Sequence, residues 1–414
     1  MNVIVIGAGP AGLLAAWAAA SAGADTVILE QKPKAALKLR ITGKGRCNIT
    51  NSGDMEDFIR QFPGSGKFLY GAFTRFFRED LLSLLATEQV EVTEERGGRI
   101  FPVSGRAGDV ADALVRAALS QGARLRTGTR AASLILDQDR VTGVRTGDGT
   151  ELYGSVIVAT GGKSYPQTGS DGSGYILARQ AGHTVSPLYP SLVSLNILEF
   201  WIPSLAGLAL KNVRLTALTG GKNPPGGFGE MLFTHNGISG PIVLSLSRDL
   251  VPVLESGLKV PLSLDLKPAL DRETLDHRLV RETAGERKEL ATYMKTLVPR
   301  SLIPPLLQIS VLDGRKKASS LTRPERERLV QVLKDLPMQA VGHGGFGEAV
   351  VTRGGVSLKQ IHPRTMESRL FPGLYFAGEV LDLDAYTGGY NLQAAFSTGY
   401  LAGISAAGEE DMHG

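Results

Sequence analysis

The stretch VIVIGAGPAGLLAAWAAASAGADTVILE, residues 3–30, decides the fold of this chain. Its first four residues, Val3–Ile6, form an apolar run typical of a short buried strand, and Thr26–Leu29 forms a second one. Between them, an alanine-rich helix that ends near Ser21 begins directly after a glycine-rich turn. This β-α-β order predicts the opening of a doubly wound parallel sheet, and the glycines at the strand-to-helix turn indicate a bound dinucleotide.

Each type of residue in and near this turn has a physical reason to be at a dinucleotide site. The glycines of the G-x-G-x-x-G pattern permit a tight turn and the close approach of a pyrophosphate, and the helix start offers unpaired N–H groups and partial positive charge. Glu30 ends the second strand, where its carboxylate can accept hydrogen bonds from ribose hydroxyls and would repel a 2′-phosphate. The cofactor contacts expected here are Gly7, Gly9, Pro10, Ala11, Gly12, Glu30, Gln31 and Lys32.

Two later strands run into the same kind of small-residue turn. Val156–Gly162 (VIVATGG) and Gly373–Glu379 (GLYFAGE) are each typical of a buried strand whose end lets the backbone pass close to a pyrophosphate. The segment GGYNLQ, residues 388–393, then opens the last helix, and a helix start aimed at the flavin N1/C2 carbonyl would stabilise the charge of reduced flavin. Glu379 or Asp382 is a candidate to hold a ribityl hydroxyl. The order of these motifs predicts FAD, with contacts from Thr160, Gly161, Gly378, Glu379, Asp382, Gly389, Tyr390, Asn391, Leu392 and Gln393.

Composition limits the class of protein. The chain has 414 residues, 43% of them hydrophobic and 21% charged, which indicates a globular protein of two or three domains. Cys47 is the one cysteine, so no disulfide forms within the chain and the disulfide-reductase branch of flavoenzymes is excluded. The six histidines show no ligand spacing, which argues against a metal site. A basic leader and an apolar run of about 18 residues are both missing, so a cytoplasmic location without membrane contact is expected.

The character of the sequence changes twice along the chain. From about Leu188 to Leu266, short β-type pieces are separated by proline and glycine, and residues 268–336 are typical of helices. We therefore predict an α/β protein whose doubly wound, Rossmann-type FAD-binding domain is split by an inserted β-barrel-like piece and a helical subdomain. Residues 32–52 are expected to form a loop. The expected bounds are 1–190 and 353–414 for the FAD-binding domain, 191–267 and 338–352 for the β-rich piece, and 268–337 for the helical subdomain.

Positive charge is concentrated in the predicted helical subdomain. The chain has a net charge of +4 and an isoelectric point near 9.0, and residues 271–335 alone hold 14 Lys and Arg against 10 Asp and Glu, a surplus of 4. One interpretation is an ordinary solvated helical surface, and the other is a surface that faces a polyanion. Aromatic residues make up only 6% of the chain and no recognisable RNA-binding motif accompanies the charge.

Four blocks of the sequence resemble a known family. They are TGKGRCNITN at 42–51, ATGGKSYPQTGSDGSGY at 159–175, LFTHNGISGP at 232–241 and GLYFAGEVLDLDAYTGGYNLQAAFSTGYLAG at 373–403. Together they resemble the bacterial BaiN-like (YhiN-type) flavoproteins, often labelled aminoacetone-oxidase-like, over essentially the whole chain. The second block is also similar, more distantly, to succinate dehydrogenase and fumarate reductase flavoproteins. The resemblance implies non-covalent FAD, a two-part inserted domain, and a loop along the flavin that contributes Thr42, Gly43, Lys44, Gly45, Arg46 and Asn48.

The candidate catalytic residues each have a functional and a structural interpretation. By resemblance, Lys44 or Arg46 would stabilise the flavin N1/C2 oxyanion or hold an acidic substrate. Cys47 is either a proton donor or a small buried residue. His235, in a Gly-rich turn of the insert, is the candidate general acid because an imidazole titrates near working pH, or else it is a hydrogen-bonded structural residue. Tyr386 either faces the substrate or packs within its loop.

The function expected from these features is reduction by a flavin. A second complete G-x-G-x-x-G unit is missing, so NAD(P)H is expected to visit the flavin only transiently as electron donor. The resembled family is linked to two reductions of a C=C bond conjugated to a carbonyl: dihydrouridine formation in large-subunit rRNA, which we favour, and reduction of unsaturated steroids in bile-acid metabolism. In the first, the basic insert 271–335 would contact the RNA. The alternatives are a reductase of a small-molecule enone, an amine oxidase that uses O₂, and a non-catalytic flavin-containing binding or sensor protein.

Overall fold

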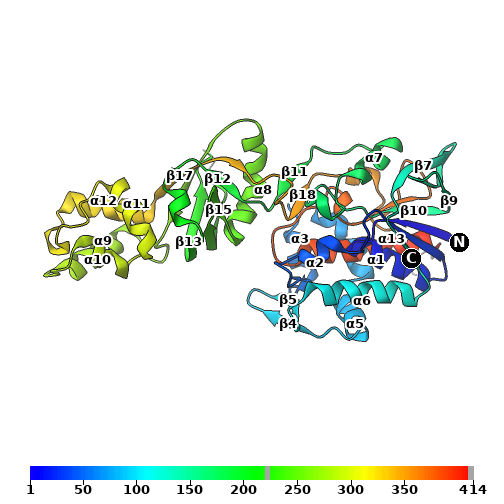
Figure 1. Cartoon of the computed structure of the whole chain (residues 1–414), viewed down its shortest axis with the longest axis horizontal. Coiled ribbons are helices and arrows are strands. Elements are labelled where there is room, and N and C mark those ends of the chain that lie inside the picture. Colours follow the sequence, from blue (N-terminus) through cyan, green and yellow to red (C-terminus); the bar gives the residue numbers. More distant parts are fainter. Residues whose placement is uncertain (220–223, 409–414) are drawn as a thin grey trace. The chain divides into compact units, whose positions relative to one another are not determined.

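The computed structural model describes residues 1–219 and 224–408. The chain divides into two compact units, the first built from Met1–Pro190 and Ala349–Gly414 and the second from Ser191–Glu348. The first unit is therefore discontinuous in sequence, because the second unit is inserted into it (Figure 1).

One parallel sheet of five strands organises the first unit, in the order β19-β10-β1-β2-β6. Every adjacent pair runs parallel, and the apolar residues of the central strand are buried on both faces, as a sheet covered by helices requires. The strands are β1 Asn2–Ile6, β2 Asp25–Glu30, β6 Arg124–Thr127, β10 Ser155–Val158 and β19 Leu374–Phe376.

Two helices from opposite ends of the sequence pack against each other beside this sheet. They are α1 (Pro10–Ser21), which is alanine-rich and buried over most of its surface, and α13 (Tyr390–Ala406). A Cβ on Gly399 would overlap the carbonyl oxygen of Ala11, so the two backbones are in direct contact there. Small side chains thus join the first and last parts of the chain into one core.

The remaining helices of the first unit are α2 Leu37–Ile41, α3 Met55–Arg60, α4 Tyr70–Arg75, α5 Arg78–Thr87, α6 Ala107–Ser120 and α7 Ser173–Gln180. Two antiparallel sheets, β3-β5-β4 and β7-β8-β9, complete it, with strands β3 Thr50–Asn51, β4 Val92–Glu95, β5 Arg99–Pro102, β7 Ala131–Asp137, β8 Arg140–Thr146 and β9 Glu151–Tyr153. Helix α2 and strand β3 lie in the segment 32–52 that was expected to be a loop, so that expectation was wrong for these residues. The helix forms because Leu39 is buried in the core and the N–H of Ala36 is anchored on the carbonyl of Ala8.

A closed barrel of six antiparallel strands forms the second unit together with a group of helices. In barrel order the strands are β12 Leu195–Ile197, β15 Gly237–Ser239, β14 Gly226–Phe233, β13 Ala209–Ala217, β16 Val260–Asp265 and β17 Leu336–His343. The helices are α8 Pro241–Glu255, α9 Arg272–Thr283, α10 Leu290–Tyr293, α11 Ile303–Ser310 and α12 Arg323–Lys334. One apolar core runs through the barrel and the helices. Strands β11 (Tyr189–Ser191) and β18 (Val351–Arg353) lie where the chain passes between the units.

Helix α8 is a correction to the sequence analysis, which expected only β-type pieces between residues 188 and 266. The prolines at 241 and 252 and the many valines and leucines of this segment are typical of strands and loops. In the structure Pro241 is the first helical residue, a position that proline tolerates, and Ile242, Leu246, Leu250 and Leu254 are buried at helical spacing. Packing of this apolar stripe against the barrel outweighs the low helix propensity.

The expected fold class is confirmed, because a parallel Rossmann-type sheet, a closed barrel and a helical part are all present. No helix among residues 1–219 and 224–408 is long and apolar enough to span a membrane.

A buried histidine makes the stability of the first unit depend on pH. The His183 side chain is 3% exposed, its Nε2 lies 2.8 Å from Ser368 Oγ, and its Nδ1 has no partner among the described residues. Burial lowers its pKa from 6.5 to about 4. Because the unfolded state binds a proton that the folded state rejects, stability is lost as pH falls from about 6.5 to 4, by on the order of 3 kcal/mol.

This pH dependence is measurable by urea unfolding between pH 4 and 7.5. The wild-type free energy of unfolding should fall more steeply below pH 6.5 than that of His183→Gln, which cannot titrate there. Parallel profiles for the two proteins would contradict the assignment to His183, whatever their absolute stabilities.

Candidate cofactor-binding site

A cavity lies where four strands of the parallel sheet end. Ile6 in β1, Glu30 in β2, Ala159 after β10 and Ala377 after β19 all line it. The space between its walls is about 1360 Å³, counting the part open to solvent. The carboxyl edge of a parallel sheet is the place where α/β folds bind nucleotides. All of its described lining residues belong to the first unit.

The glycine turn between β1 and α1 forms one wall of this cavity. Gly7 has a φ of 102°, and a Cβ there would lie 2.6 Å from the carbonyl oxygen of Ala159. A Cβ on Gly12 would overlap the carbonyl oxygen of Gly7, whereas a Cβ on Gly9 would meet no atom within 4 Å. Gly7 and Gly12 are therefore required by the fold itself, and Gly9 keeps clear the space in front of the start of α1, where N–H groups have no acceptor within the helix.

Glu30 is held rigidly beside the glycine turn. Its Oε2 accepts a hydrogen bond from the N–H of Ala8 at 2.9 Å, and its Oε1 accepts one from the N–H of Lys32 at 2.8 Å. The residue is 8% exposed. A carboxylate fixed in this way, at the end of the second strand, has the position from which dinucleotide-binding folds recognise a ribose.

Another wall is formed by a loop whose residues were not among the expected cofactor contacts. Thr168, Gly169 and Ser170 line the cavity, and Gln31 Nε2 donates to the carbonyl of Gly169 at 2.7 Å. A Cβ on Gly161 would lie 2.7 Å from Ser170 Oγ, so the loop packs directly on the turn that follows β10. The run TGSDG at 168–172 was the available signal, since such a cluster marks a tight turn.

The start of α13 forms a further part of the cavity wall, where Asn391 and Leu392 line it. The Asn391 amide accepts from the N–H of Ala385 at 2.9 Å and donates to its carbonyl at 3.0 Å, which fixes the preceding loop. Gly389 has a φ of 98°, and a Cβ there would lie 2.5 Å from the carbonyl carbon of Thr50. The first turn of a long helix is therefore held at the cavity by contacts that only glycine permits.

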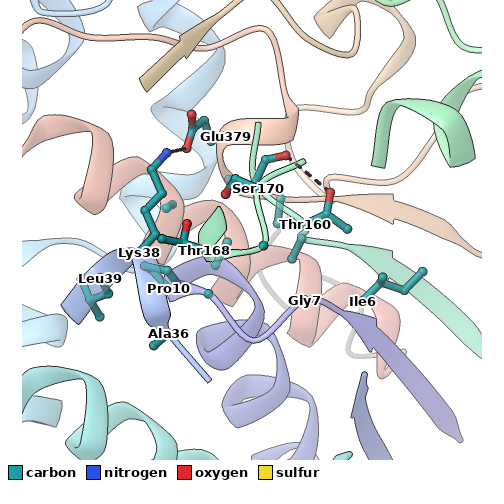
Figure 2. Close-up of a pocket in the computed structure, with 18 of the residues that line it drawn as sticks. Ile6, Gly7, Pro10, Ala36, Lys38, Leu39, Thr160, Thr168, Ser170 and Glu379 are labelled. Carbon is teal, nitrogen blue, oxygen red and sulfur yellow. Dashed lines mark hydrogen bonds and ion pairs between the residues drawn. The ribbon is translucent and has the colours of Figure 1, made fainter. Parts of the chain in front are cut away.

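Lys38 and Glu379 form an ion pair in the cavity wall (Figure 2). Lys38 Nζ lies 2.7 Å from Glu379 Oε2, and the two side chains are 21% and 18% exposed. Glu379 Oε1 accepts a hydrogen bond from the N–H of Thr352 at 2.8 Å. Glu379 was among the expected cofactor contacts, whereas Lys38, which lies in the segment expected to be a loop, was missed.

The predicted cofactor contacts divide into two groups. Those that line the cavity are Gly7, Gly9, Pro10, Ala11, Glu30, Gln31, Thr42, Thr160, Gly161, Gly378, Glu379, Asn391 and Leu392. Those outside the lining are Gly12, Lys32, Gly43, Lys44, Gly45, Arg46, Asn48, Asp382, Gly389, Tyr390 and Gln393. Lining residues missed from the sequence include Lys38, Phe62, Thr129, Arg130, Val350 and Val351, which no local motif marks.

Several residues of the second group have partners away from the cavity. Asp382 Oδ2 accepts from Ser186 Oγ at 2.7 Å. Gln393 is buried, accepts from Thr50 Oγ1 at 2.8 Å and donates to Ser397 Oγ at 3.1 Å, so its amide supports the start of α13 from inside the core.

Three candidate residues, Lys44, Arg46 and Cys47, lie in the loop that follows α2, and each has a different environment. Arg46 forms an ion pair with Glu95, which lowers the pKa of that carboxyl, and its guanidinium lies 4.5 Å from the centre of the Phe101 ring. Lys44 is exposed and has a positive φ of 58°. Cys47 is fully buried in the core, and burial raises its pKa to about 12. A thiol in that environment holds its proton tightly, which matches its structural interpretation better than its catalytic one.

The remaining two candidates lie apart from the cavity lining. His235 is exposed in the turn between β14 and β15 of the second unit. Tyr386 is half-buried in the loop before α13, and its carbonyl lies 3.5 Å from Asn391 Nδ2. Among residues 1–219 and 224–408, no group of three His, Cys, Asp or Glu side chains is arranged to hold a metal ion.

The parallel sheet, the glycine turn, the fixed Glu30 and a cavity at the carboxyl edge of the sheet define a nucleotide-cofactor-binding protein of the Rossmann type. FAD fits these residues, because the open position at Gly9 and the two helix starts are suited to a pyrophosphate and an electron-rich ring. The chain belongs to the family described as HI0933-like protein Rossmann domain, whose model matches residues 1–405.

Curated relatives match the chain over nearly its whole length. It is 36% identical to the 3-dehydro-bile acid Δ(4,6)-reductase of Clostridium scindens, over 98% of this chain and 99% of that one. It is 32% identical to the ribosomal RNA dihydrouridine synthase of Haemophilus influenzae, over 97% of each chain, and 31% identical to that of Escherichia coli, over 96% of each. The protein is thus a FAD-dependent oxidoreductase of this family, as the sequence analysis expected.

A solved structure shares the fold at low sequence identity. The 3-ketosteroid-Δ4-(5α)-dehydrogenase of Rhodococcus jostii RHA1 matches with a TM-score of 0.50 and 15% identity, covering 98% of this chain and 96% of that one. At this identity the likeness concerns the fold alone.

Proposed function

We propose that this protein reduces a C=C bond conjugated to a carbonyl, and that its substrate is uridine in large-subunit rRNA. The names of the full-length relatives describe reductions of two such bonds, in a 3-keto-4,6-diene steroid and in the uracil ring. In both, hydride adds to the carbon β to the carbonyl and a proton adds to the α carbon, so the bond gains two hydrogens, and both electrons come with the hydride. FAD supplies the hydride when it is bound in its reduced form.

The residues at the α13 end of the cavity have the task of stabilising charge in this reaction. The N–H groups of Asn391 and Leu392 belong to the first turn of α13, whose partial positive charge favours an anionic ring. His235 is the proposed proton donor, because it is exposed whereas the Cys47 thiol is buried in the core. NAD(P)H is the proposed two-electron donor, and anaerobic bleaching of the flavin absorbance by NADH or NADPH tests it.

The observation that favours RNA over a small steroid is a set of unpaired cations on the inserted unit. Half of the basic residues between positions 271 and 335 have acidic partners, such as Arg278 with Glu282 and Arg326 with Asp276. The other half are exposed and form no ion pair with any residue in the described ranges: Arg281, Arg287, Lys295, Arg300, Arg315, Lys317 and Arg328. Cations without partners are the ones that neutralise phosphates at no cost of breaking an ion pair.

Three of these cations lie in two segments that contact each other. Glu289 bridges to Lys317, and the neighbouring Leu290 N–H donates to the carbonyl of Lys316. Arg287 and Arg315 each lie two residues before this bridge in the sequence, and all three cations are exposed. Residues 286–289 and 313–317 together hold five Lys and Arg against three Asp and Glu, a surplus of two positive charges.

Loss of these three cations should weaken RNA binding in a salt-dependent way. The variant Arg287→Gln/Arg315→Gln/Lys317→Gln should lower the slope of log K against log salt by roughly 2 to 3, since each lost phosphate contact removes about 0.7 to 0.9. The measurement is fluorescence anisotropy with a labelled fragment of large-subunit rRNA. The control variant Lys34→Gln/Arg96→Gln/Lys359→Gln has the same net charge but changes exposed residues of the first unit. Equal slopes for the two variants would contradict RNA contact through these three cations.

The function itself is tested in the host organism. Deletion of the gene should abolish dihydrouridine in purified large-subunit rRNA, measured by nucleoside mass spectrometry. The wild-type gene and Cys47→Ala should restore the signal, and Gly9→Ala and His235→Ala should not. An unchanged signal, in a host whose rRNA contains dihydrouridine, would exclude the proposed substrate.

The second candidate is reduction of a small-molecule enone. It is favoured by the 36% identity to the bile-acid reductase over essentially both whole chains. Turnover of a 3-keto-4-ene steroid with NAD(P)H, followed by loss of the enone ultraviolet absorbance, would support this candidate if rRNA dihydrouridine does not depend on the gene.

A further inference from the structure

We propose that Lys38, oriented by Glu379, is the cation that binds the pyrophosphate of FAD. This inference rests on the family's cofactor and is independent of the substrate proposed above.

The backbone places Lys38 beside the glycine turn. The N–H of Ala36 donates to the carbonyl of Ala8 at 2.9 Å, which ties the start of α2 to the turn between β1 and α1. Ala36 itself takes the left-handed conformation, with a φ of 58°, and this directs the chain from the anchor into the helix. Figure 2 shows the Lys38 side chain extending from the neighbourhood of Pro10 to Glu379.

The ion pair fixes the direction of the ammonium group. Both oxygens of Glu379 have donors, Lys38 Nζ at 2.7 Å and the N–H of Thr352 at 2.8 Å, so the carboxylate cannot turn freely. A lysine ammonium has three donors, and Glu379 uses one of them. Two remain for a ligand in the cavity, and a long side chain held in place in advance loses little entropy when it binds.

Among the charged residues that line the cavity, Lys38 is the one placed to bind the pyrophosphate. The described charged residues that line the cavity are Glu30, Lys38, Arg130 and Glu379. Arg130 lies at the ribose end, because the preceding Thr129 donates its N–H to the carbonyl of Glu30, and its guanidinium lies 3.7 Å from Asp171. Near the glycine turn, a dianionic pyrophosphate would therefore meet the start of α1 and Lys38, with Lys38 also separating it from the Glu379 carboxylate.

A double-mutant cycle distinguishes this role from a purely structural ion pair. Dissociation constants are measured on the full-length chain freed of flavin, by calorimetry, for FAD, ADP and riboflavin. Lys38→Met should raise the constants for FAD and ADP by roughly 10- to 100-fold and leave riboflavin within twofold, because a charge-assisted hydrogen bond to phosphate is lost. Lys34→Met, an exposed lysine before the same helix, is the matched control and should bind all three ligands like the wild type.

The variant Glu379→Gln and the double variant supply the second arm. Lys38→Met leaves the Glu379 carboxylate without its counter-ion beside the phosphates, so Lys38→Met/Glu379→Gln should regain part of the lost affinity, yet stay at least fivefold weaker than the wild type for FAD and ADP. Full recovery in the double variant would show that Lys38 serves only to neutralise Glu379. Unchanged ADP binding by Lys38→Met, or an equal loss for riboflavin, would also overturn the proposal.

Discussion

Replacement of Gly9 by alanine should weaken FAD binding strongly and leave the fold intact, whereas replacement of Gly12 should also destabilise the fold. A Cβ at Gly9 meets no protein atom within 4 Å, and its φ of −83° suits any residue, so the only thing it obstructs is the ligand. A Cβ at Gly12 overlaps the carbonyl oxygen of Gly7, and α1 would have to move away from the sheet. Substitutions of two glycines in one motif are thus predicted to have different effects.

Thermal unfolding with and without added FAD distinguishes the effects of the two substitutions. Flavin-free Gly9→Ala should unfold within 2 °C of the flavin-free wild type, and FAD should stabilise it far less, because tenfold weaker binding removes about 1.4 kcal/mol of ligand stabilisation. Gly12→Ala should lose on the order of 1 to 3 kcal/mol or fail to accumulate as soluble protein. If Gly9→Ala bound FAD with wild-type affinity, the pyrophosphate could not lie at this turn.

Replacement of Gly389 by alanine should cause the second largest loss, at the opposite end of the cavity. The residue has a φ of 98°, and a Cβ there would lie 2.5 Å from the carbonyl carbon of Thr50 in β3. The left-handed conformation alone costs about 1 to 2 kcal/mol for alanine, and the steric clash adds to this by separating α13 from β3. Since Asn391 and Leu392 line the cavity from this helix start, flavin affinity and stability should fall together.

A matched glycine isolates the steric part of this effect. Gly128 also has a positive φ, 67°, but a Cβ there meets nothing within 4 Å, so Gly128→Ala suffers the conformational cost alone. Urea unfolding should show Gly389→Ala at least about 1 kcal/mol less stable than Gly128→Ala, and only Gly389→Ala should shift the midpoint potential of its remaining flavin. Equal losses in the two variants would mean that the contact with Thr50 contributes nothing.

The cavity and the proposed substrate contacts lie in different units of the chain. The described residues that line the cavity all belong to the first unit, whereas the proposed proton donor His235 and the cations Arg287, Arg315 and Lys317 belong to the second. We therefore expect substitutions in the inserted unit to change the choice of substrate and to leave flavin binding unchanged.

The sequence alone determined the class of fold and the two ends of the cofactor cavity. Gly7, Gly9, Glu30 and Gly389 are recognisable because each does its work through its own backbone conformation or at a strand end, and such local requirements leave a fixed spacing in the chain. The change to β-type and then helical texture after residue 188 also reflects local periodicity.

Only the tertiary structure decided which side chains share the cavity and which have partners elsewhere. Lys38 and Glu379 are 341 residues apart, Arg46 turns to Glu95, and Cys47 points into the core. Helix α8 was missed for a related reason, since burial of its apolar stripe outweighs the strand-like composition of the segment. Pairing and burial are set by the packing of segments distant in sequence. Composition and spacing therefore do not predict which partner a charged side chain or an apolar face will contact.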